Sequence, residues 1–352
     1  MSSAEPKTKE LFSVSAQKRL FDYCAEKMVG GNVNPFALTP DASVREYYRI
    51  PWNNAVSAIV ALYPEPFAAA TQPFLDVTNL FQAAGLPVPE IYDVDEKRGL
   101  IIQEDFGDRQ LFDYYRSATE DDCERLLESA INLIARIQGA TQLAFERKSI
   151  ASKLAFDFDK LNWELGFFVE HFFSSLRKER LNKKLAGKLQ QELNTLAQEL
   201  ADKPRVLCHR DFHSSNLLVD AAGELRVIDY QDARQGPASY DLVSLLLDRV
   251  TRPPSLARIR AGRLLFLEER VAIGLPRIDN EEFTTEFRLM TIQRVLKAIG
   301  TFSFQIGVRG RGGTYARYIQ PMLCVALQAA ELLGRFPVLQ EVITARRKDE
   351  YC

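Results

Sequence analysis

The sequence predicts an α+β protein of two lobes, a small β-rich lobe at the N-terminus and a larger, mainly helical lobe after it. Three observations support this fold class. The chain has 352 residues, 46% of them hydrophobic, which exceeds the usual size of one domain and suffices for a large core. Most strand-like runs fall in the first hundred residues, whereas long helical patterns follow Gly107. We therefore expect an N-terminal lobe over residues 1–105 and a C-terminal lobe over residues 106–352.

The N-terminal lobe is expected to be mostly sheet. Apolar residues at helical spacing predict an amphipathic helix over 8–28. Two β-rich runs, 45–50 and 55–62, flank the turn residues Asn53 and Asn54 and predict a hairpin. The remaining elements expected in this lobe are an inserted helix over 73–84 and two short strands over 89–93 and 99–103.

The C-terminal lobe is expected to consist of helices around a few short strands. Ser117-Ala-Thr-Glu120 forms a capping-box pattern ahead of an apolar stripe that runs from Leu126 to Ile137. Further helical patterns cover 160–176, 184–200, 254–272, 280–300 and 320–335. Short strands are predicted at 206–208, 217–219 and 225–228, with a hairpin turn over Asp220–Gly223 between the last two.

Composition excludes several functional classes. A net charge of −2 disfavours a nucleic-acid partner, which would need a basic field. The five cysteines are scattered and lack zinc-site spacing, so we expect reduced thiols. The polar N-terminus has no signal-peptide pattern, and no apolar run is long enough to cross a membrane. These features predict a soluble, cytoplasmic protein, and they leave its oligomeric state open.

The segment CHRDFHSSN, residues 208–216, carries the strongest chemical signal. His209-Arg210-Asp211 followed by Asn216 has the H-R-D-x-x-x-x-N spacing of phosphoryl-transfer loops. An aspartate there accepts the proton of an attacking hydroxyl, and the asparagine turns back to bind Mg²⁺. Asp229 ends a β-branched run and is the predicted second magnesium ligand. Either residue of the loop alone would more often cap a turn, but the joint pattern favours catalysis.

With these motifs the sequence resembles the aminoglycoside phosphotransferase and choline kinase superfamily, small-molecule kinases with a protein-kinase-like, two-lobed fold. The resemblance is carried by HRDFHSSN, by VIDYQDA at 227–233 and by GPASYDL at 236–242. It implies an ATP- and Mg²⁺-dependent enzyme with Asp211 as catalytic base and Asn216 and Asp229 on the metal. It also implies that His209 and Asp241 brace the loop, although capping of the following helix would by itself explain Asp241.

His213 and the hinge between the lobes extend this comparison. Protein kinases lack a histidine at the position of His213, and here structural support and contact with substrate or phosphate are equally open. The strand end Ile101–Glu104 with the following turn is typical of a hinge that holds adenine through backbone groups. We assign Gln103, Glu104 and Phe106 to nucleotide binding on this basis.

The N-terminal lobe departs from the family pattern. Its first turn lacks a glycine-rich signature, and residues 57–63 contain no lysine to pair with the ATP phosphates. Ser43 and Arg45 are the alternative phosphate ligands, and Asp76 is a candidate acidic partner on the inserted helix. The competing interpretation is a nucleotide-binding pseudokinase that no longer transfers phosphate.

For the acceptor, the sequence is most similar to bacterial kinases that phosphorylate the anomeric hydroxyl of N-acetylmuramate and N-acetylglucosamine in peptidoglycan recycling. The similar segments are DASVREYYR, GLPVP and YDLVSLL, at 41–49, 85–89 and 240–246, and this subgroup also tends to lack the strand lysine. Glu164 and Asp232 are candidates for sugar hydroxyls, and Arg309 and Arg311, in a segment expected to be a basic loop, for the lactyl carboxylate. An aminoglycoside, choline or homoserine-like acceptor is the alternative.

Overall fold

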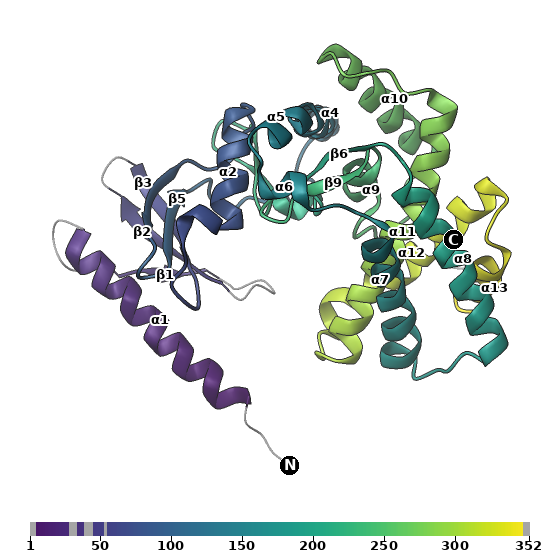
Figure 1. Ribbon diagram of the computed structural model, residues 1–352, viewed down its shortest axis with the longest axis horizontal. Coiled ribbons are helices and arrows are strands. Elements are labelled where there is room, and N and C mark those ends of the chain that lie inside the picture. The colour runs from purple at the N-terminus through teal and green to yellow at the C-terminus, as the bar shows by residue number, and fades with distance from the viewer. Residues whose placement is uncertain (1–4, 28–33, 39–44, 53–54, 348–352) are drawn as a thin grey trace.

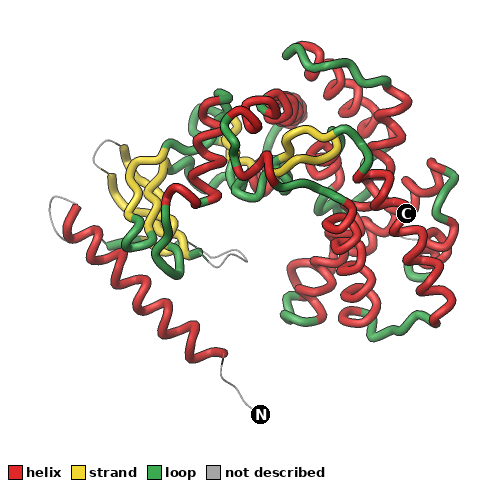
Figure 2. Tube along the Cα trace, in the orientation of Figure 1, coloured by secondary structure: helices red, strands yellow, loops and turns green. Residues whose placement is uncertain are grey.

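The structure is a computed structural model that describes residues 5–27, 34–38, 45–52 and 55–347. It has two lobes, and strands dominate the smaller one while helices dominate the larger one (Figures 1 and 2). The predicted α+β fold class is thereby confirmed. No helix in the described part of the chain combines the length and the apolar character needed to span a membrane.

A five-stranded antiparallel sheet forms the N-terminal lobe, in the order β1-β2-β3-β5-β4. Its strands are β1 (Phe36–Ala37), β2 (Glu46–Trp52), β3 (Ala55–Leu62), β4 (Ile91–Asp95) and β5 (Leu100–Glu104). The side chains alternate between the two faces, as strand geometry requires. Tyr48, Val60 and Ile102 pack with Leu20 on helix α1 (Glu5–Lys27), in a small core of their own.

The opposite face of the sheet meets helix α2 (Pro73–Ala83), which joins the main core of the protein. Ala61 and Ile101 from the sheet lie in one buried cluster with Val77 and Phe81 from α2. The predicted hairpin, the inserted helix and the second strand pair are therefore all present. Pro73 at the start of α2 suits a first helical turn, where the missing N–H costs nothing.

The C-terminal lobe contains the helices that the periodicity predicts and several short ones that it does not. The helices are α3 (Leu111–Tyr114), α4 (Glu120–Gly139), α5 (Thr141–Glu146), α6 (Ile150–Lys153), α7 (Phe158–Phe168), the π-helix η2 (Val169–Leu176), α8 (Lys183–Ala201), α9 (Tyr240–Leu247), α10 (Leu256–Ala272), α11 (Asn280–Gly307), α12 (Gly312–Leu333) and α13 (Pro337–Thr344). Two small two-stranded sheets flank residues 209–216. They pair β6 (Arg205–Cys208) with β9 (Arg234–Pro237) and β7 (Leu217–Val219) with β8 (Leu225–Val227).

Four local predictions need correction. Thr119, and not Ser117, caps α4, because its side chain accepts from the backbone N–H of Asp122. The basic loop expected over 307–317 is shorter than predicted and covers residues 308–311, with Arg309 and Arg311 in it, since α11 runs to Gly307 and α12 starts at Gly312. Strand β9 escaped prediction because its sequence RQGP has no strand-like pattern. Cys324 is disulfide-bonded, whereas Cys24, Cys123 and Cys208 are free, because pairing depends on the fold and not on local spacing.

A glycine brings two helices of the larger lobe unusually close together. A Cβ atom on Gly300 of α11 would lie only 2.7 Å from the Cα atom of Phe168 at the end of α7. The absence of a side chain at Gly300 lets the two backbones approach. As a result, the polar residues earlier on α11 face those on α7, and Gln293 donates a hydrogen bond of 2.9 Å to Glu164.

Helix α2 also ties the two lobes together. Tyr230, which follows Asp229, stacks on Phe74 of α2 with 5.4 Å between ring centroids, and its hydroxyl lies 2.9 Å from that of Thr78. Asp76 accepts hydrogen bonds from Ser149 and from the backbone of Ile150 at the start of α6. The proposed pairing of Asp76 with a phosphate-binding cation is therefore wrong, because its carboxylate holds the C-terminal lobe.

Candidate active site

A buried aspartate of α9 accepts hydrogen bonds from the loop between β6 and β7. Asp241 accepts hydrogen bonds from the backbone N–H groups of His209 (2.7 Å) and Arg210 (3.0 Å), and His209 Nε2 lies 3.0 Å from the carbonyl oxygen of Ile228. Arg210 has a positive φ of 88°, so the chain turns sharply there. The preferred capping role of Asp241 is wrong, since no side chain caps α9 and Asp241 braces the loop instead.

Two substitutions of Asp241 should lower the free energy of unfolding to different extents. Asp241→Ala leaves two buried N–H groups without acceptors, for a loss of about 3 kcal/mol in the free energy of unfolding. Asp241→Asn keeps one acceptor oxygen, so roughly half of that loss is expected. Urea unfolding at pH 7 measures both values. Equal stability of the two variants would contradict this account of the loop.

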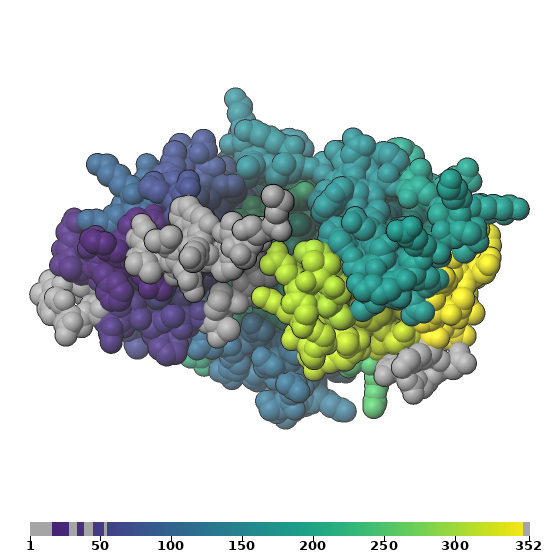
Figure 3. Space-filling model, turned by 90° about the horizontal axis from the view of Figure 1, so that it is seen from below, coloured from purple at the N-terminus to yellow at the C-terminus, as the bar shows by residue number. Residues whose placement is uncertain are grey.

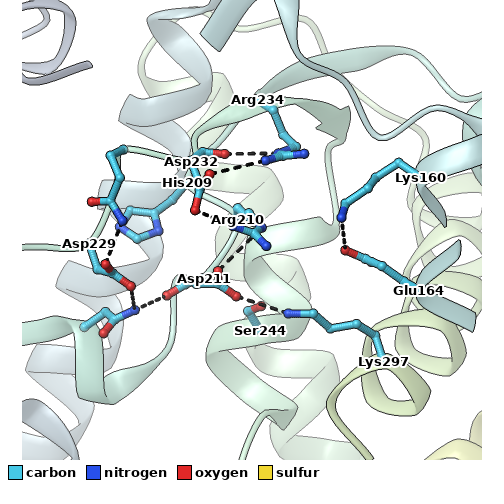
Figure 4. Close-up of polar contacts among 12 residues, drawn as sticks. Lys160, Glu164, His209, Arg210, Asp211, Asp229, Asp232, Arg234, Ser244 and Lys297 are labelled. Atoms are coloured by element: carbon cyan, nitrogen blue, oxygen red, sulfur yellow. Dashed lines mark hydrogen bonds and ion pairs between the residues drawn. The ribbon is translucent and has the colours of Figure 1, made fainter. Parts of the chain in front are cut away.

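The carboxylate of Asp211 is surrounded by three cations. Its Oδ1 atom lies 3.1 Å from Arg294 Nη2. Figure 4 shows the two other contacts, 3.4 Å from Oδ1 to Lys297 Nζ and 3.6 Å from Oδ2 to Arg210 Nε. Burial alone would raise the pKa of Asp211, but these cations outweigh it and hold the pKa well below its usual range. Asp211 is therefore ionised at neutral pH and in a fixed orientation, as an acceptor for a hydroxyl proton must be.

Asn216 and Asp229 lie together beside Asp211. Asn216 Nδ2 donates to the backbone oxygen of Asp211 (2.9 Å) and lies 3.4 Å from Asp229 Oδ2. Asp229 has a positive φ of 63°, which turns its carboxylate back toward the loop. Burial, together with the charge of Asp211, raises the pKa of Asp229. A cation at this position would relieve both effects.

The donor set fits magnesium. An amide oxygen and a carboxylate are hard oxygen ligands, and Mg²⁺ is usually bound by one or two carboxylates together with substrate phosphates and water. The described residues contain no cluster of three or more histidine, cysteine, aspartate or glutamate side chains that could hold a metal.

Arg45 brings a positive charge from the N-terminal lobe to the same place. Its Nη2 atom lies 3.8 Å from Asp229 Oδ1, and its side chain is only 11% exposed. The guanidinium lies over the rings of Tyr47 and Tyr63, at 5.6 and 5.7 Å from their centroids. Ser43, the other residue expected to hold phosphates, lies outside the described residues.

The arrangement of a base, two oxygen ligands and a neighbouring arginine agrees with the comparison to known proteins. Residues 37–273 match the family described as phosphotransferase enzyme family. The chain belongs to this family. The match covers about two thirds of the phosphotransferase and includes the complete catalytic segment.

Curated relatives cover most of the phosphotransferase. It is 28% identical over 278 residues to the N-acetylmuramate/N-acetylglucosamine kinase of Pseudomonas aeruginosa. The aligned region covers 78% of each chain. It is 29% identical over 308 residues to the protein of the same name from Neisseria meningitidis, over 86% of this chain and 89% of the relative.

Solved structures confirm the fold of the phosphotransferase. Amicoumacin kinase in complex with AMP-PNP and Ca²⁺ aligns with a TM-score of 0.61 at 14% identity, over 89% of this chain and 95% of the other. Choline kinase from Cryptosporidium parvum aligns with a TM-score of 0.59 at 10% identity, over 93% and 99%. The protein-kinase-like, two-lobed fold is thus confirmed.

The hinge of the phosphotransferase borders an open pocket of about 710 Å³. Glu104 and Phe106 line it, but Gln103 does not, so two of the three predicted hinge residues share this pocket. Arg49 donates to Asp105 (2.5 Å) and to Asp108 (2.7 Å), and it thereby ties β2 to the hinge.

The candidate acceptor residues divide into two groups. Asp232 forms an ion pair of 2.6 Å with Arg210, so it is linked to Asp211 through one guanidinium. Glu164, 1% exposed, lies 3.6 Å from Lys160, and Figure 4 shows this pair across from Asp232 with Lys297 reaching toward Asp211. Both acidic residues are therefore near the base and already have cationic partners.

Arg309, Arg311 and His213, the other candidates for acceptor binding, differ from Asp232 and Glu164 in their surroundings. Arg309 and Arg311 are exposed at the junction of α11 and α12, which reaches the surface in the middle of the molecule (yellow-green in Figure 3). Within the described residues, neither forms an ion pair with Asp211, Asp232 or Glu164. Burial lowers the pKa of His213 to about 4, so its ring is neutral at pH 7.

Sequence reasoning missed two functional residues, Arg294 and Lys297. They lie one turn apart on α11 and both reach Asp211. A signal for them existed in the sequence, because these two cations lie in a largely apolar stretch of α11 whose residues Met290, Val295 and Ile299 are buried. Buried lysine and arginine are rare without a partner, and such a position deserves to be considered functional.

Proposed function

We propose that this phosphotransferase uses ATP and Mg²⁺ to phosphorylate the anomeric hydroxyl of N-acetylmuramate or N-acetylglucosamine, as expected of a cytoplasmic enzyme of cell-wall recycling. The single observation that carries the proposal is the position of Asp211. Its carboxylate is held by neighbouring cations and lies beside the pair Asn216 and Asp229. Curated relatives with that name, 28–29% identical over most of the chain, support the acceptor.

In the proposed reaction the sugar hydroxyl attacks the γ-phosphorus of ATP while the bond from this phosphorus to the β-γ bridging oxygen breaks. The hydroxyl proton passes to the Asp211 carboxylate, and ADP leaves. Asn216 and Asp229 would hold the metal, which when bound neutralises phosphate charge. Gln103, Glu104 and Phe106 are proposed to flank adenine at the hinge between lobes 1–105 and 106–352.

Charge around Asp211 argues against a cationic acceptor. Arg210, Arg234, Lys160 and Lys297 are gathered in this region, and each carboxylate there already has a cationic partner. An aminoglycoside or choline would add positive charge next to these groups, which costs several kcal/mol when like charges meet away from water. A neutral or acidic sugar does not have this cost.

Incubation with ATP, Mg²⁺ and a panel of sugars, amino alcohols and aminoglycosides tests the proposal. We expect one phosphate on an amino sugar, seen by mass spectrometry, with a phosphorus NMR coupling to the anomeric proton. The same mixture with Asp211→Asn is the control. Phosphate on another hydroxyl, or on choline or an aminoglycoside only, would reject the proposed acceptor. ATP binding without transfer to any acceptor would support the pseudokinase instead.

Arg45 is the proposed substitute for the missing strand lysine. Arg45→Ala should raise the KM for ATP by about 10- to 100-fold, because one charge-assisted contact to phosphate is lost. Affinity for adenosine, which has no phosphate, should stay unchanged. Arg116→Ala is the matched control, since Arg116 is exposed and pairs only loosely with Asp113. An equal loss of ATP and adenosine affinity would show that Arg45 supports the lobe and does not bind phosphate.

A further inference from the structure

We propose that Lys297 is a catalytic residue that binds the phosphoryl group during its transfer to the acceptor. This inference rests on the proposed phosphotransfer at Asp211 and adds a residue to it. Helix α11 would then supply, from the C-terminal lobe, the positive charge that β3 lacks in the N-terminal lobe. The argument depends on the position of Lys297, on its exposure and on the charge balance around it.

Lys297 and Arg294 contact the same oxygen of Asp211 but differ in access. Arg294 is 2% exposed and is bound on several sides, because it also donates to Ser244 (2.6 Å) and pairs with Asp248 (3.3 Å). Lys297 is 17% exposed, and its Nζ atom lies 3.4 Å from Asp211 Oδ1. Arg294 is thus a positioning residue, whereas the side chain of Lys297 is partly exposed and forms an ion pair with Asp211 alone among the described residues.

Four cations around Asp211 share three aspartates as their ion-pair partners. Arg210 and Arg234 share Asp232, and Arg294 is shared between Asp211 and Asp248. Among the described residues, Lys297 forms an ion pair with Asp211 alone, and Asp211 already faces two arginines. The group comprises four cations and three aspartates.

A largely buried cation that shares its ion-pair partner with two arginines is incompletely compensated, and an arriving anion would stabilise it. Burial, and after it the charge of Arg294, lowers the pKa of Lys297, as expected for a cation that lacks a full counter-charge. Asp211, Glu164 and Arg210 are the other charged groups that act on it. The anion that the proposed reaction brings to Asp211 is the transferring phosphoryl group.

The chemistry of the reaction gives Lys297 a defined task. Phosphoryl transfer is accelerated mainly by positioning and by cations that stabilise charge on the phosphoryl oxygens. The described strand β3, residues 55–62, offers no cation for this purpose. A lysine next to the base lies beside the attacking oxygen, where the phosphoryl group must arrive.

The competing account is that Lys297 only orients Asp211. Double substitution separates the two accounts. If Lys297 acts solely through Asp211, then Lys297→Met has no further effect in the Asp211→Asn background. If Lys297 binds the phosphoryl group, its loss lowers the residual rate of Asp211→Asn as well.

The experiment uses Lys297→Met and Lys297→Arg in the full chain, with Lys188→Met on the exposed face of α8 as the matched control. We expect Lys297→Met to lower kcat by about 10²- to 10³-fold with little change in the KM for ATP, and Lys297→Arg to restore part of the rate. Binding of ADP with Mg²⁺ should be unchanged, whereas binding of ADP, Mg²⁺ and aluminium fluoride, which imitates the phosphoryl group in flight, should weaken about 100-fold.

The outcomes separate this inference from the proposed function. A kcat within threefold of wild type for Lys297→Met, or an effect that disappears in the Asp211→Asn background, overturns the role of Lys297. A wild-type enzyme that phosphorylates no sugar overturns the proposed function, but the aluminium fluoride measurement needs no sugar and still decides for or against Lys297. A thermal melt of each variant checks folding, and Lys297→Arg keeps the charge if Lys297→Met unfolds.

Discussion

Asp211→Asn is expected to lower kcat by about 10²- to 10⁴-fold, because the amide cannot take the proton of the attacking hydroxyl. The KM for ATP should change little, since Asp211 is the proposed base for the acceptor and does not line the pocket beside Glu104 and Phe106. The substitution also removes the carboxylate that faces Arg210, Arg294 and Lys297, so a lower melting temperature is expected.

Steady-state kinetics with the identified acceptor and a thermal melt measure both effects. Asp202→Asn at the end of α8 is the matched control, because that aspartate is exposed and its carboxylate accepts a hydrogen bond from Gln198 of the same helix. Turnover within a few-fold of wild type for Asp211→Asn would show that the base lies elsewhere. A large loss of activity with an unchanged melting temperature would contradict the proposed balance of charge in the cluster.

Asp229→Asn should remove activity and at the same time stabilise the protein. Loss of the carboxylate weakens the metal site, and we expect kcat/KM to fall by about 10³-fold or more. The folded-state pKa of Asp229 is raised above its unfolded value, so its ionised form destabilises the native state at neutral pH. Asparagine has no charge and tolerates the positive φ at this position well. A melting temperature about 2 °C above wild type is expected.

Two measurements check the account of Asp229. In the wild type, Mg²⁺ with ATP should raise the melting temperature through binding to the native state, and this rise should vanish in Asp229→Asn. The substitution should also change how the free energy of unfolding depends on pH at acidic pH. In the wild type, the stability contributed by protonated Asp229 is lost as the pH rises through its raised pKa. A fall of several degrees in the melting temperature would show that Asp229 is structural. Asp202→Asn again serves as control.

The catalytic segment could be predicted from the sequence because its chemistry lies in a short stretch. Asp211, Asn216 and Asp229 are joined by one hairpin, so local spacing alone determines which of them come together. The strands and long helices were predictable for the same reason, since periodicity of 2 or 3.6 is a local property. The role of Asp241 was harder to predict, because capping and bracing use the same carboxylate and only its buried contacts distinguish them.

The acceptor side depends on contacts between segments far apart in the chain. Lys297 and Arg294 reach Asp211 across more than eighty residues, and Glu164 reaches Gln293 across 129. Arg309 and Arg311 attracted attention as a basic stretch, yet they lie exposed at a helix junction while the buried cations come from the middle of α11. Local sequence cannot rank such cations, because their effect is set by burial and by the charges that surround them.

The sequence by itself determined the two-lobed fold class and the family, and it placed Asp211, Asn216 and Asp229, the residues proposed for catalysis and metal binding, around one hairpin. Only the tertiary structure decided which charges surround the base. Helix packing across Gly300 brings α11 against α7, and the fold of the N-terminal lobe brings Arg45 next to Asp229. The physical reason is that electrostatic interactions act through space and gain strength with burial. The local sequence determines neither the distances between charged groups nor their burial.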